Sequence, residues 1–392
     1  MQLAGEPEFQ VFLSVDDFSL DDVAPILPQR IHLRKSYWRN LELSPNSSFQ
    51  LYYVLIRLSG KIVGFCCFQR VHFDGGQLLH YLPEDKPGFW NQLRRKTSKL
   101  LALPVLPLIQ VDLLVSGNVF MTGDSGFYFS PDIRMKKRAD WFNRAVTKVA
   151  EQDKRIRAVL IPDMYSPKTE WDDCLEQQGY YPIYEEADMV LSLQDEWKVF
   201  DDYTSAMSSK YRVRTKKVYQ LSAALECREM TLADLQQHQP EMLQLYAQVI
   251  KNARFKLAEL PVDFFLKQKE ILPDDYMVTG YFHQGKLLGF LSAYIQPEQI
   301  DVHYTGMHYP DSYAFHLYQR MLYDMIEQGI RRRKKRLHFG RTAPEIKSTV
   351  GAVPLDTYGY VRHFSPFINH LIVAFFSRRL KPVYYNYRSP FR

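Results

Sequence analysis

The apolar and polar positions of the first half predict a mixed α/β unit that begins with a β-hairpin. Two apolar runs flank the dipeptide Ser59-Gly60, which is typical of a tight turn between antiparallel strands. Farther along, apolar residues recur at helical spacing with basic residues between them, which predicts an amphipathic helix. The predicted order is hairpin, strand, helix, strand, helix, strand, over the ranges 50–58, 61–69, 108–116, 133–152, 157–162, 167–178 and 187–193.

The second half predicts the same order after two additional helices. A second hairpin surrounds Gln284-Gly285, and a strand and a long amphipathic helix follow it. A basic run, RRRKKR at 331–336, then leads into a short strand and a turn that contains Gly, Arg and Pro. The predicted ranges are 201–219, 231–253, 277–284, 287–295, 299–305, 312–330, 337–339, 344–350 and 357–363, before an apolar and aromatic tail.

Two short motifs occur once in each half of the chain. GKIVGF at 60–65 matches GKLLGF at 285–290, and QVDLLVSG at 110–117 matches QIDVHYTG at 299–306. A repeat with so long a period indicates two related domains rather than a solenoid. We therefore predict a duplicated domain whose two copies need not have kept the same role.

The length agrees with a duplication, because 392 residues exceed what one hydrophobic core usually supports. The last strand of the first half gives way to a basic helix near 194–200, which places the predicted domains at 1–197 and 198–392. The first copy carries an insertion at about 69–108 between its two motifs. From periodicity alone, each copy is an α/β (α+β) domain.

Composition is that of an ordinary globular protein, with 46% apolar and 24% charged residues and a net charge of +6. Cys66 and Cys67 are adjacent in an apolar strand, so their side chains should point to opposite faces. The four cysteines have no CxxC spacing, so neither a metal site nor a disulfide framework is expected. No basic and apolar leader is visible, and the apolar runs near 100–109 and 371–376 are too short to span a bilayer, so a cytoplasmic location is expected.

The densest candidate site is FGRTAPEIKSTVGA at 339–352, directly after a short strand. Ligands of open α/β sheets bind outside the carboxyl ends of strands, and Gly340 allows a close backbone approach. Arg341 and Lys347 are suited to a phosphate or carboxylate, and Glu345 could accept a proton from an amine. The alternative is a capped turn in which Arg341 pairs with Glu345.

A second candidate is the strand at 299–306. Strict alternation would place Asp301, His303 and Thr305 on one face and Tyr304 on the other. Tyr304 could hydrogen-bond an acyl carbonyl, and His303 or Asp301 could act as a base. Core packing is the alternative for both aromatic rings. The matching positions of the first copy are apolar, which favours a role for this polar set in the second domain alone.

Two further segments could bind an anion. SSKYRVRTKK at 208–217 concentrates cations that could clamp a phosphate, although most charge runs are solvated helix faces. The loop at 117–127 precedes a helix and could offer backbone N–H groups, but its spacing matches no known phosphate loop. The candidate binding residues are Ser208, Lys210, Arg212, Arg214, Lys217, Gly117 and Asn118.

Two segments combine apolar, aromatic and basic residues in close order, at 89–109 and 367–388. Such segments can lie at a lipid interface, where cations contact headgroups and apolar side chains enter the bilayer. Packing between domains is the alternative. The first interpretation predicts peripheral contact with the inner face of a membrane.

The segments 208–217, 299–306 and 339–352 resemble the second domain of FemABX-like proteins of the Gcn5-related N-acetyltransferase (GNAT) superfamily. The stretch LLVSGNVFMTGDSGF at 113–127 resembles their first half. The resemblance implies two tandem GNAT-like domains that transfer an acyl or aminoacyl group to an amine. It also implies a functional role for Lys347 and for the basic helix, whose matching residues are Arg212, Arg214, Lys216 and Lys217.

The resemblance implies acyl-CoA or acyl carrier protein as co-substrate, with no tightly bound cofactor and no metal. The turn at 306–315 lacks the glycines with which single-domain acetyltransferases bind coenzyme A, as FemABX relatives also do. The acceptor is expected to be a lipid amine or a cell-envelope precursor. Two alternatives stay open: a ligase that uses aminoacyl-tRNA, and a non-catalytic protein that binds an envelope fragment. No DNA partner is expected.

Overall fold

The computed structural model describes residues 5–43, 49–77, 109–123, 125–165, 167–253, 256–261, 263–373, 377 and 385–391. Most of the predicted insertion, and therefore most of the segment at 89–109, lies outside these residues. Within the described part, no helix is both long and apolar enough to cross a bilayer.

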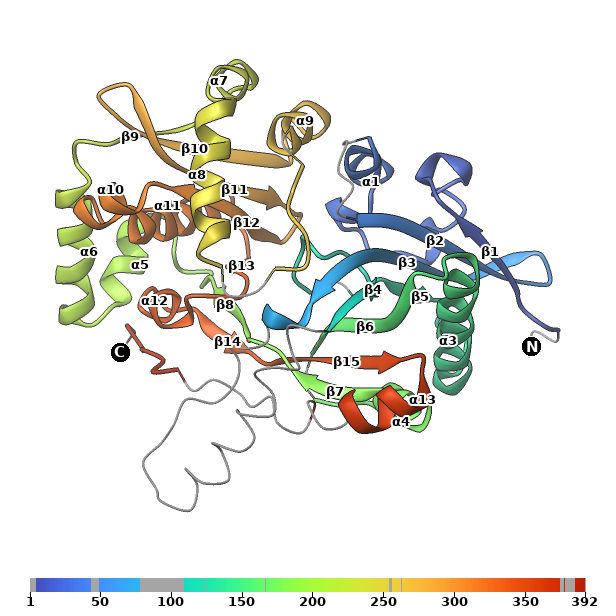
Figure 1. Ribbon diagram of the computed structural model, residues 1–392. Coiled ribbons are helices and arrows are strands. Elements are labelled where there is room, and N and C mark those ends of the chain that lie inside the picture. The colour runs from blue at the N-terminus through green and yellow to red at the C-terminus, as the bar shows by residue number, and fades with distance from the viewer. Residues whose placement is uncertain are drawn as a thin grey trace.

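In the described part of the first half, α3 and α4 pack on one face of a mixed sheet, and α1 lies on the side that faces the second half (Figure 1). Its elements are β1 (Glu8–Phe12), α1 (Lys35–Glu42), β2 (Phe49–Leu58), β3 (Lys61–Asp74), β4 (Gln110–Ser116), β5 (Phe127–Phe129), α3 (Met135–Gln152), β6 (Ile156–Tyr165), α4 (Glu170–Gln177), β7 (Tyr181–Tyr184) and β8 (Asp188–Ser192).

The second half repeats this plan with more helices. Its elements are α5 (Phe200–Ala206), α6 (Ser209–Leu221), β9 (Glu226–Glu229), α7 (Leu232–Gln237), α8 (Gln239–Lys251), α9 (Phe264–Ile271), β10 (Tyr276–His283), β11 (Lys286–Ile295), β12 (Gln299–Met307), α10 (Tyr309–Ala314), α11 (Leu317–Arg331), β13 (Arg336–His338), α12 (Pro344–Ser348), β14 (Val353–Leu355), β15 (Thr357–His363) and α13 (Pro366–Ile368).

The strands form two sheets, and each sheet takes one strand from the other half of the chain. The first sheet has the order β1-β2-β3-β4-β6-β15-β7, with β5 paired to β3. The second has the order β14-β8-β13-β12-β11-β10-β9. The late strand β15 therefore lies between β6 and β7, and the early strand β8 lies between β13 and β14. A domain boundary at 197/198 stays a prediction, because the sheets do not divide cleanly there.

Three apolar cores fill the molecule. One lies between the first sheet and α3 and α4, and another between the second sheet and α5, α6 and α11. The third is shared, because it combines side chains of α1 and the first sheet with side chains of α8, α9 and the second sheet. Cys67 belongs to the shared core and Cys66 to the core under α3, which confirms that they point to opposite faces.

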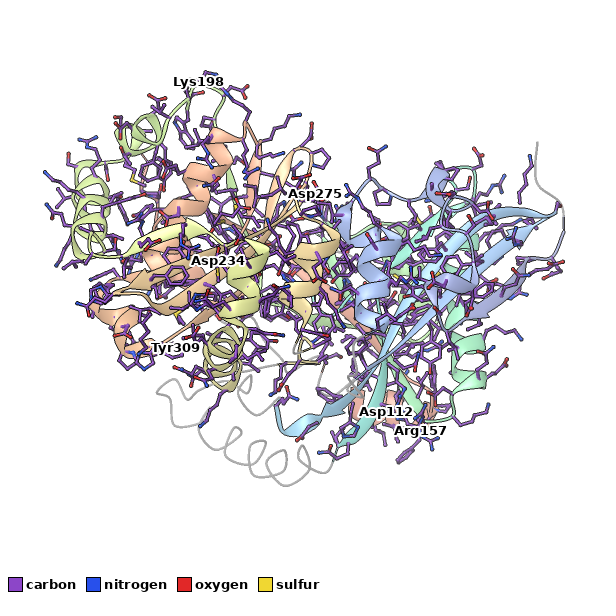
Figure 2. The ribbon with its side chains drawn as sticks, turned by 90° about the horizontal axis from the view of Figure 1, so that it is seen from above. Asp112, Arg157, Lys198, Asp234, Asp275 and Tyr309 are labelled. Carbon is purple, nitrogen blue, oxygen red and sulfur yellow. The ribbon has the colours of Figure 1, made fainter. Side chains whose placement is uncertain are left out.

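Polar contacts supplement the shared core where the halves meet. Arg34 pairs with Asp275 at 2.6 Å, and Figure 2 places Asp275 between the two halves. Deeper in, the Asn40 amide donates to Gln268 at 2.6 Å. The backbone N–H of Ile31 donates to the side-chain oxygen of Gln296 at 3.0 Å. The two halves are thus joined by a common apolar core, hydrogen bonds and two exchanged strands.

Three predicted helices were too long. The basic helix expected at 201–219 is broken at Met207 and Ser208, whose extended backbone forms a bridge and a hydrogen bond with the chain near Phe391. The helix expected at 231–253 divides at His238, just before a proline that favours a new helix start. The helix expected at 312–330 divides at His316, which has a left-handed backbone.

The strand exchange can be tested with Tyr360, a fully buried residue of β15 whose hydroxyl donates to Glu176 in the first half at 3.1 Å. Tyr360→Ala should lower the free energy of unfolding by about 3–4 kcal/mol, because it leaves a cavity in the core under α3. Hydrogen exchange should accelerate most in β6. Tyr387→Ala, in the same tail but 44% exposed, is the control and should cost less than about 1 kcal/mol. Faster exchange confined to the second sheet would contradict the exchanged arrangement.

Candidate functional site

Four strands of the second sheet place polar side chains in one row on one face. In the strand register, Tyr276 lies opposite Tyr294, Tyr294 opposite Asp301, and Asp301 opposite His338. Residues directly opposite one another share a face of a sheet. We call these four residues the junction row, because Tyr276 and Tyr294 lie in the core shared with the first half.

The junction row lies where two parallel strands separate. β12 and β13 pair over three positions, of which Asp301 and His338 are the last, and β12 then continues to Met307 paired with β11 but no longer with β13. Just beyond Asp301, β12 contains a β-bulge. In its pairing with β11, β12 advances by three residues, from Val302 to Thr305, while β11 advances by only two. Bulges are frequent beside functional sites, where they redirect side chains.

Because of the bulge, the strict alternation predicted for β12 is wrong. Ser292 on β11 faces both His303 and Tyr304, and its hydroxyl bonds the backbone N–H and C=O of Tyr304 at 3.1 Å each. Both rings consequently lie on the face of the junction row, with His303 against Tyr294 and Tyr304 in the shared core. Thr305 instead contacts Met321 of α11 on the opposite face.

Burial sets the protonation states of the two bulge residues. Desolvation lowers the pKa of His303 to about 3, so its ring is neutral at pH 7 and is a weak base. Desolvation also raises the pKa of Tyr304 well above its usual value, so its hydroxyl keeps its proton. Of the two, Tyr304 is therefore suited to donate a hydrogen bond. Asp301, in contrast, accepts bonds from the side-chain amides of Gln296 and Gln299 at 2.9 and 2.6 Å.

A buried carboxylate extends the row into β8. Asp188 lies two residues from Val190, which is opposite His338, and so shares the face of the row. It is fully buried, and its Oδ2 lies 2.7 Å from Nδ1 of His338. The hydroxyl of Tyr165, at the end of β6 in the first sheet, lies 3.5 Å from the same oxygen. The row thus ends in a cluster to which both sheets contribute.

Lys347 supports this cluster from α12. It is 3% exposed, and its ammonium group donates to the backbone oxygens of Gly340 and Arg341 at 3.0 and 2.6 Å. Burial lowers its pKa to about 7, although the nearby Asp188 opposes that shift. The loop that it holds is strained, because Thr342 has a φ of 67° and is β-branched.

Arg341 docks the same loop onto the first half. Its guanidinium pairs with Asp163 at the end of β6 and with Glu185, 3.0 Å away, just before β8. Burial raises the pKa of Glu185 to about 8, so this carboxyl retains a proton near neutral pH beside the arginine. Arg341 therefore does not pair with Glu345 as in the capped-turn alternative. The backbone N–H of Asn386 donates to Glu345, which is exposed on α12.

The loop after β4 also belongs to the junction, but its N–H groups are used internally. Those of Gly117 and Val119 donate to Cys67 O and to the side chain of Gln69. The Asn118 amide donates to the hydroxyl of Tyr37 at 2.7 Å, and Tyr37 packs on Tyr294 of the junction row. This loop therefore links α1 to the row rather than presenting free amides.

The predicted cations of α6 lie apart from the junction row, at the outer edge of the second half (Figure 1). Arg212 donates to the backbone oxygens of Ser205 and Met207 and so caps α5. Ser208 precedes the first residue of α6, and its N–H donates to Pro390. The exposed cations on this helix are Lys210, Arg214, Lys216 and Lys217.

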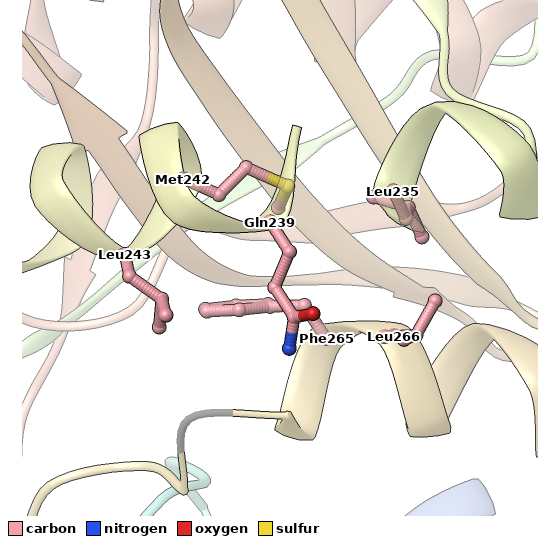
Figure 3. Close-up of a pocket in the computed structure, with 6 residues that line it drawn as sticks. All are labelled: Leu235, Gln239, Met242, Leu243, Phe265 and Leu266. Atoms are coloured by element: carbon pink, nitrogen blue, oxygen red, sulfur yellow. The ribbon is translucent and has the colours of Figure 1, made fainter. Parts of the chain in front are cut away.

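A small apolar pocket lies elsewhere, between α7, α8 and α9 (Figure 3). Its lining residues are Leu235, Gln239, Met242, Leu243, Phe265 and Leu266. Gln239 is the one polar residue among these six, and no titratable group lines the pocket. The pocket therefore contains none of the titratable groups described above.

Comparison with known proteins identifies the fold. No protein-family model matches the sequence, and no curated protein matches it. A tandem GNAT protein from the clavulanic acid biosynthesis pathway, solved without AcCoA, aligns over 92% of this chain and 99% of its own, with a TM-score of 0.54 and 11% identity. FemX aligns over 93% and 99%, with a TM-score of 0.54 and 9% identity. The protein has the FemABX-like tandem GNAT fold.

The tandem GNAT fold brings together several predicted residues and adds others. Asp301, His303, Tyr304, Arg341 and Lys347 converge at the junction, with Gly340, Gly117 and Asn118 in the adjoining loops. The residues that the sequence interpretation missed are Asp163, Tyr165, Glu185, Asp188, Tyr276, Tyr294 and His338. His338 ends the strand just before the segment at 339–352. Because ligands of open α/β sheets bind outside the carboxyl ends of strands, this position could have indicated His338. No local signal places β8 beside it.

The buried amine of Lys347 makes stability depend on pH. The folded protein releases this proton near pH 7, whereas the unfolded chain keeps it until about 10.5, so its contribution to stability rises between these values and is lost as pH falls through 7. The stability of the wild type relative to Lys347→Met should rise by about 2 kcal/mol from pH 6.5 to 9 in urea titrations. Lys216→Met, at an exposed site of α6, should show no such trend. An equal trend in both variants would contradict a buried neutral amine.

Proposed function

We propose that the protein is an N-acyltransferase that moves an acyl group from a thioester donor to an amine acceptor at the junction row. The observation that carries this proposal is the separation of β12 from β13 directly beyond Asp301 and His338. An acyl group inserted there would meet the bulge residues and the buried polar cluster. Because the cluster is enclosed by both halves, hydrogen bonds within it would act in a medium of low dielectric constant.

The protonated hydroxyl of Tyr304 gives the site a donor for the developing negative charge. Attack of an amine on a thioester carbonyl places charge on the carbonyl oxygen, and fixed donors that face this oxygen lower the barrier. Tyr304 is held by the two hydrogen bonds of its backbone to Ser292 and by the rings of Tyr246 and His303. Its position would therefore be set before the reaction.

The proposed donor is acyl-CoA or acyl carrier protein, as the resemblance implies. The turn at 306–315, which lacks the glycines of single-domain acetyltransferases, folds into the short helix α10. The donor would thus be held differently from coenzyme A in those enzymes. The solved tandem GNAT protein, whose name refers to AcCoA, supports a CoA ester as the first donor to test.

The proposed acceptor is a lipid amine or a cell-envelope precursor. In the described part of the tail, Phe367 and Leu371 are 71% and 51% exposed and lie four residues apart. Their exposure favours peripheral contact of a cytoplasmic protein with the inner face of a membrane. The remainder of this argument rests on 89–109 and on 374–384, which lie outside the described residues except for Ile109 and Ser377.

One observation favours the aminoacyl-tRNA alternative. Lys210, Arg214, Lys216 and Lys217 are exposed on α6, and such a run suits a polyanion. A non-catalytic binding protein is the remaining alternative. One assay distinguishes these three functions. The protein is mixed with a donor, which is acyl-CoA, acyl carrier protein or aminoacyl-tRNA, and with an acceptor, which is dodecylamine or a muropeptide bearing a free amine.

For the thioester proposal, we expect amide formation from acyl-CoA or acyl carrier protein, measured by mass spectrometry. Tyr304→Phe should lower kcat about 100-fold, because it removes a donor to the transition state. Tyr281→Phe is the control, since Tyr281 is buried on the opposite face of the same sheet, and it should keep wild-type kcat. Turnover only with aminoacyl-tRNA would favour the ligase. Muropeptide binding without any turnover would contradict an enzyme.

A further inference from the structure

The largely buried His338 and the fully buried Asp188 form a pair that the sequence interpretation did not single out. Asp188 is fully buried, and its Oδ2 lies 2.7 Å from His338 Nδ1. The two residues come from β13 and β8, which pair only because β8 has joined the second sheet. A histidine oriented by a buried carboxylate is the arrangement by which many enzymes prepare a proton acceptor.

The carboxylate fixes which ring nitrogen carries the proton. A carboxylate oxygen accepts hydrogen bonds, so Nδ1 of His338 donates to Asp188, and Nε2 is the ring nitrogen left to accept a hydrogen bond. Nε2 is buried and has no hydrogen-bond partner among the described residues. An unpaired buried acceptor costs about 1–3 kcal/mol, so this position favours a molecule that supplies an N–H or O–H group.

The same nitrogen lies at the proposed reaction site. His338 forms the last rung between β13 and β12, opposite Asp301, and the strands separate immediately afterwards. The bulge with Tyr304 follows within three residues on β12. The proposed proton acceptor and the proposed oxyanion donor therefore both lie close to the point where the pairing of β12 with β13 ends.

We propose that His338 takes the proton from the acceptor amine and that Asp188 is its positioning residue. This inference rests on the proposed N-acyl transfer. The amine nitrogen forms a bond to the thioester carbonyl carbon, the C–S bond breaks, and the electron pair leaves on sulfur. Nε2 accepts one proton from the nitrogen and returns it to the thiolate, which gives an amide and a free thiol.

The other candidate bases are less suited to this step. The pKa of His303 is lowered to about 3, so it binds a proton weakly at neutral pH. Both oxygens of Asp301 already accept side-chain amides, and Glu345 accepts a backbone N–H on the outer surface of α12. His338 is the candidate that combines a fixed orientation with an unpaired acceptor nitrogen.

Several charged and titratable groups surround the pair and would contribute to any pH dependence of the activity. Asp188 and Tyr165 contact each other, Asp301 lies on the adjacent strand, and Lys347 interacts with Asp188 from α12. Lys347 also titrates near neutral pH, with a pKa of about 7. A loss of activity on acidification is therefore assigned to His338 only if it disappears in a His338 variant that retains Lys347.

The first test needs no turnover. Ring-labelled histidine NMR of the full chain, assigned with His338→Gln, should show a neutral ring with its proton on Nδ1, and Asp188→Asn should shift this tautomer equilibrium. A proton on Nε2 in the wild type would overturn the inference. The wild-type spectrum decides this point even if a variant does not fold.

The second test is kinetic, with acetyl-CoA and palmitoyl-CoA as donors and dodecylamine as acceptor. His338→Gln should lower kcat about 100-fold with little change in KM, and should remove the acidic limb of the pH profile. His238→Gln is the matched control, because His238 is also buried and lies 2.5 Å from a carboxylate, that of Glu241, far from the junction row. It should retain wild-type kcat.

The outcomes distinguish this inference from the proposed function. If the wild type turns over and His338→Gln keeps its rate and pH profile, the role of His338 is wrong while acyl transfer stands. If the wild type forms no amide from any donor, N-acyl transfer and the catalytic role of His338 are both wrong. The tautomer measurement then decides only the geometry of the pair.

Discussion

The exchange of one strand between the two sheets is the constraint on which the remaining structure depends. β8 lies between β13 and β14, and β15 lies between β6 and β7, so the chain enters the second sheet at β8 and returns to the first at β15. This arrangement brings Asp188 beside His338 and makes the shared core continuous. Without it, the last rung between β12 and β13 would lie at the edge of a sheet.

The fixed junction also allows many polar groups to be buried. The hydroxyl of Tyr294 and Oδ1 of Asp188 have no hydrogen-bond partner among the described residues. Each such atom costs about 1–3 kcal/mol, which single contacts nearby cannot offset. The apolar side chains of three cores offset this cost. Strain and unpaired polar atoms in an otherwise well-packed fold are typical of functional sites.

The sequence predicted those parts of the fold that rest on local pattern and repetition. The hairpins, the helix α3 and the two-copy order follow from periodicity and from the motifs at 60–65 and 285–290. The segment at 339–352 was recognised because its residue types are unusual after a strand. The breaks at Met207 and His316 were missed, since their causes are a distant partner and a left-handed backbone that no glycine signals.

Tertiary placement accounts for the rest of the site. Asp188 and Glu185 appear in the sequence as ordinary acidic residues before a strand, and only the exchange turns them towards His338 and Arg341. Tyr304 was placed on the wrong face because a bulge adds one residue between strands, which alternation cannot anticipate. Lys347 was predicted as a site residue from the segment in which it lies. Its hydrogen bonds to two backbone oxygens could not be predicted, because they depend on the conformation of the strained loop.

The two halves differ at the positions that match the polar site of the second half. In the first sheet, Asp112 of β4 lies opposite Ile156 of β6, which is the rung equivalent to Asp301 and His338. Asp112 is held by Arg70 at 2.7 Å and contacts His72, so its charge is neutralised locally. The pairing of β4 with β3 runs from Phe68 to Asp74 without a register shift, so no bulge redirects its apolar residues.

The two copies therefore share a scaffold but differ in chemistry. The first copy has an isoleucine where the second has His338, and its β4 pairs with β3 without the bulge that β12 has against β11. Yet the first copy supplies Asp163 and Glu185, which pair with Arg341 of the second, and Tyr165, which contacts Asp188 in the second sheet. We infer that the first copy encloses and orients the site while the second carries the reacting groups. This division follows from the exchange, because neither copy alone contains all of the cluster.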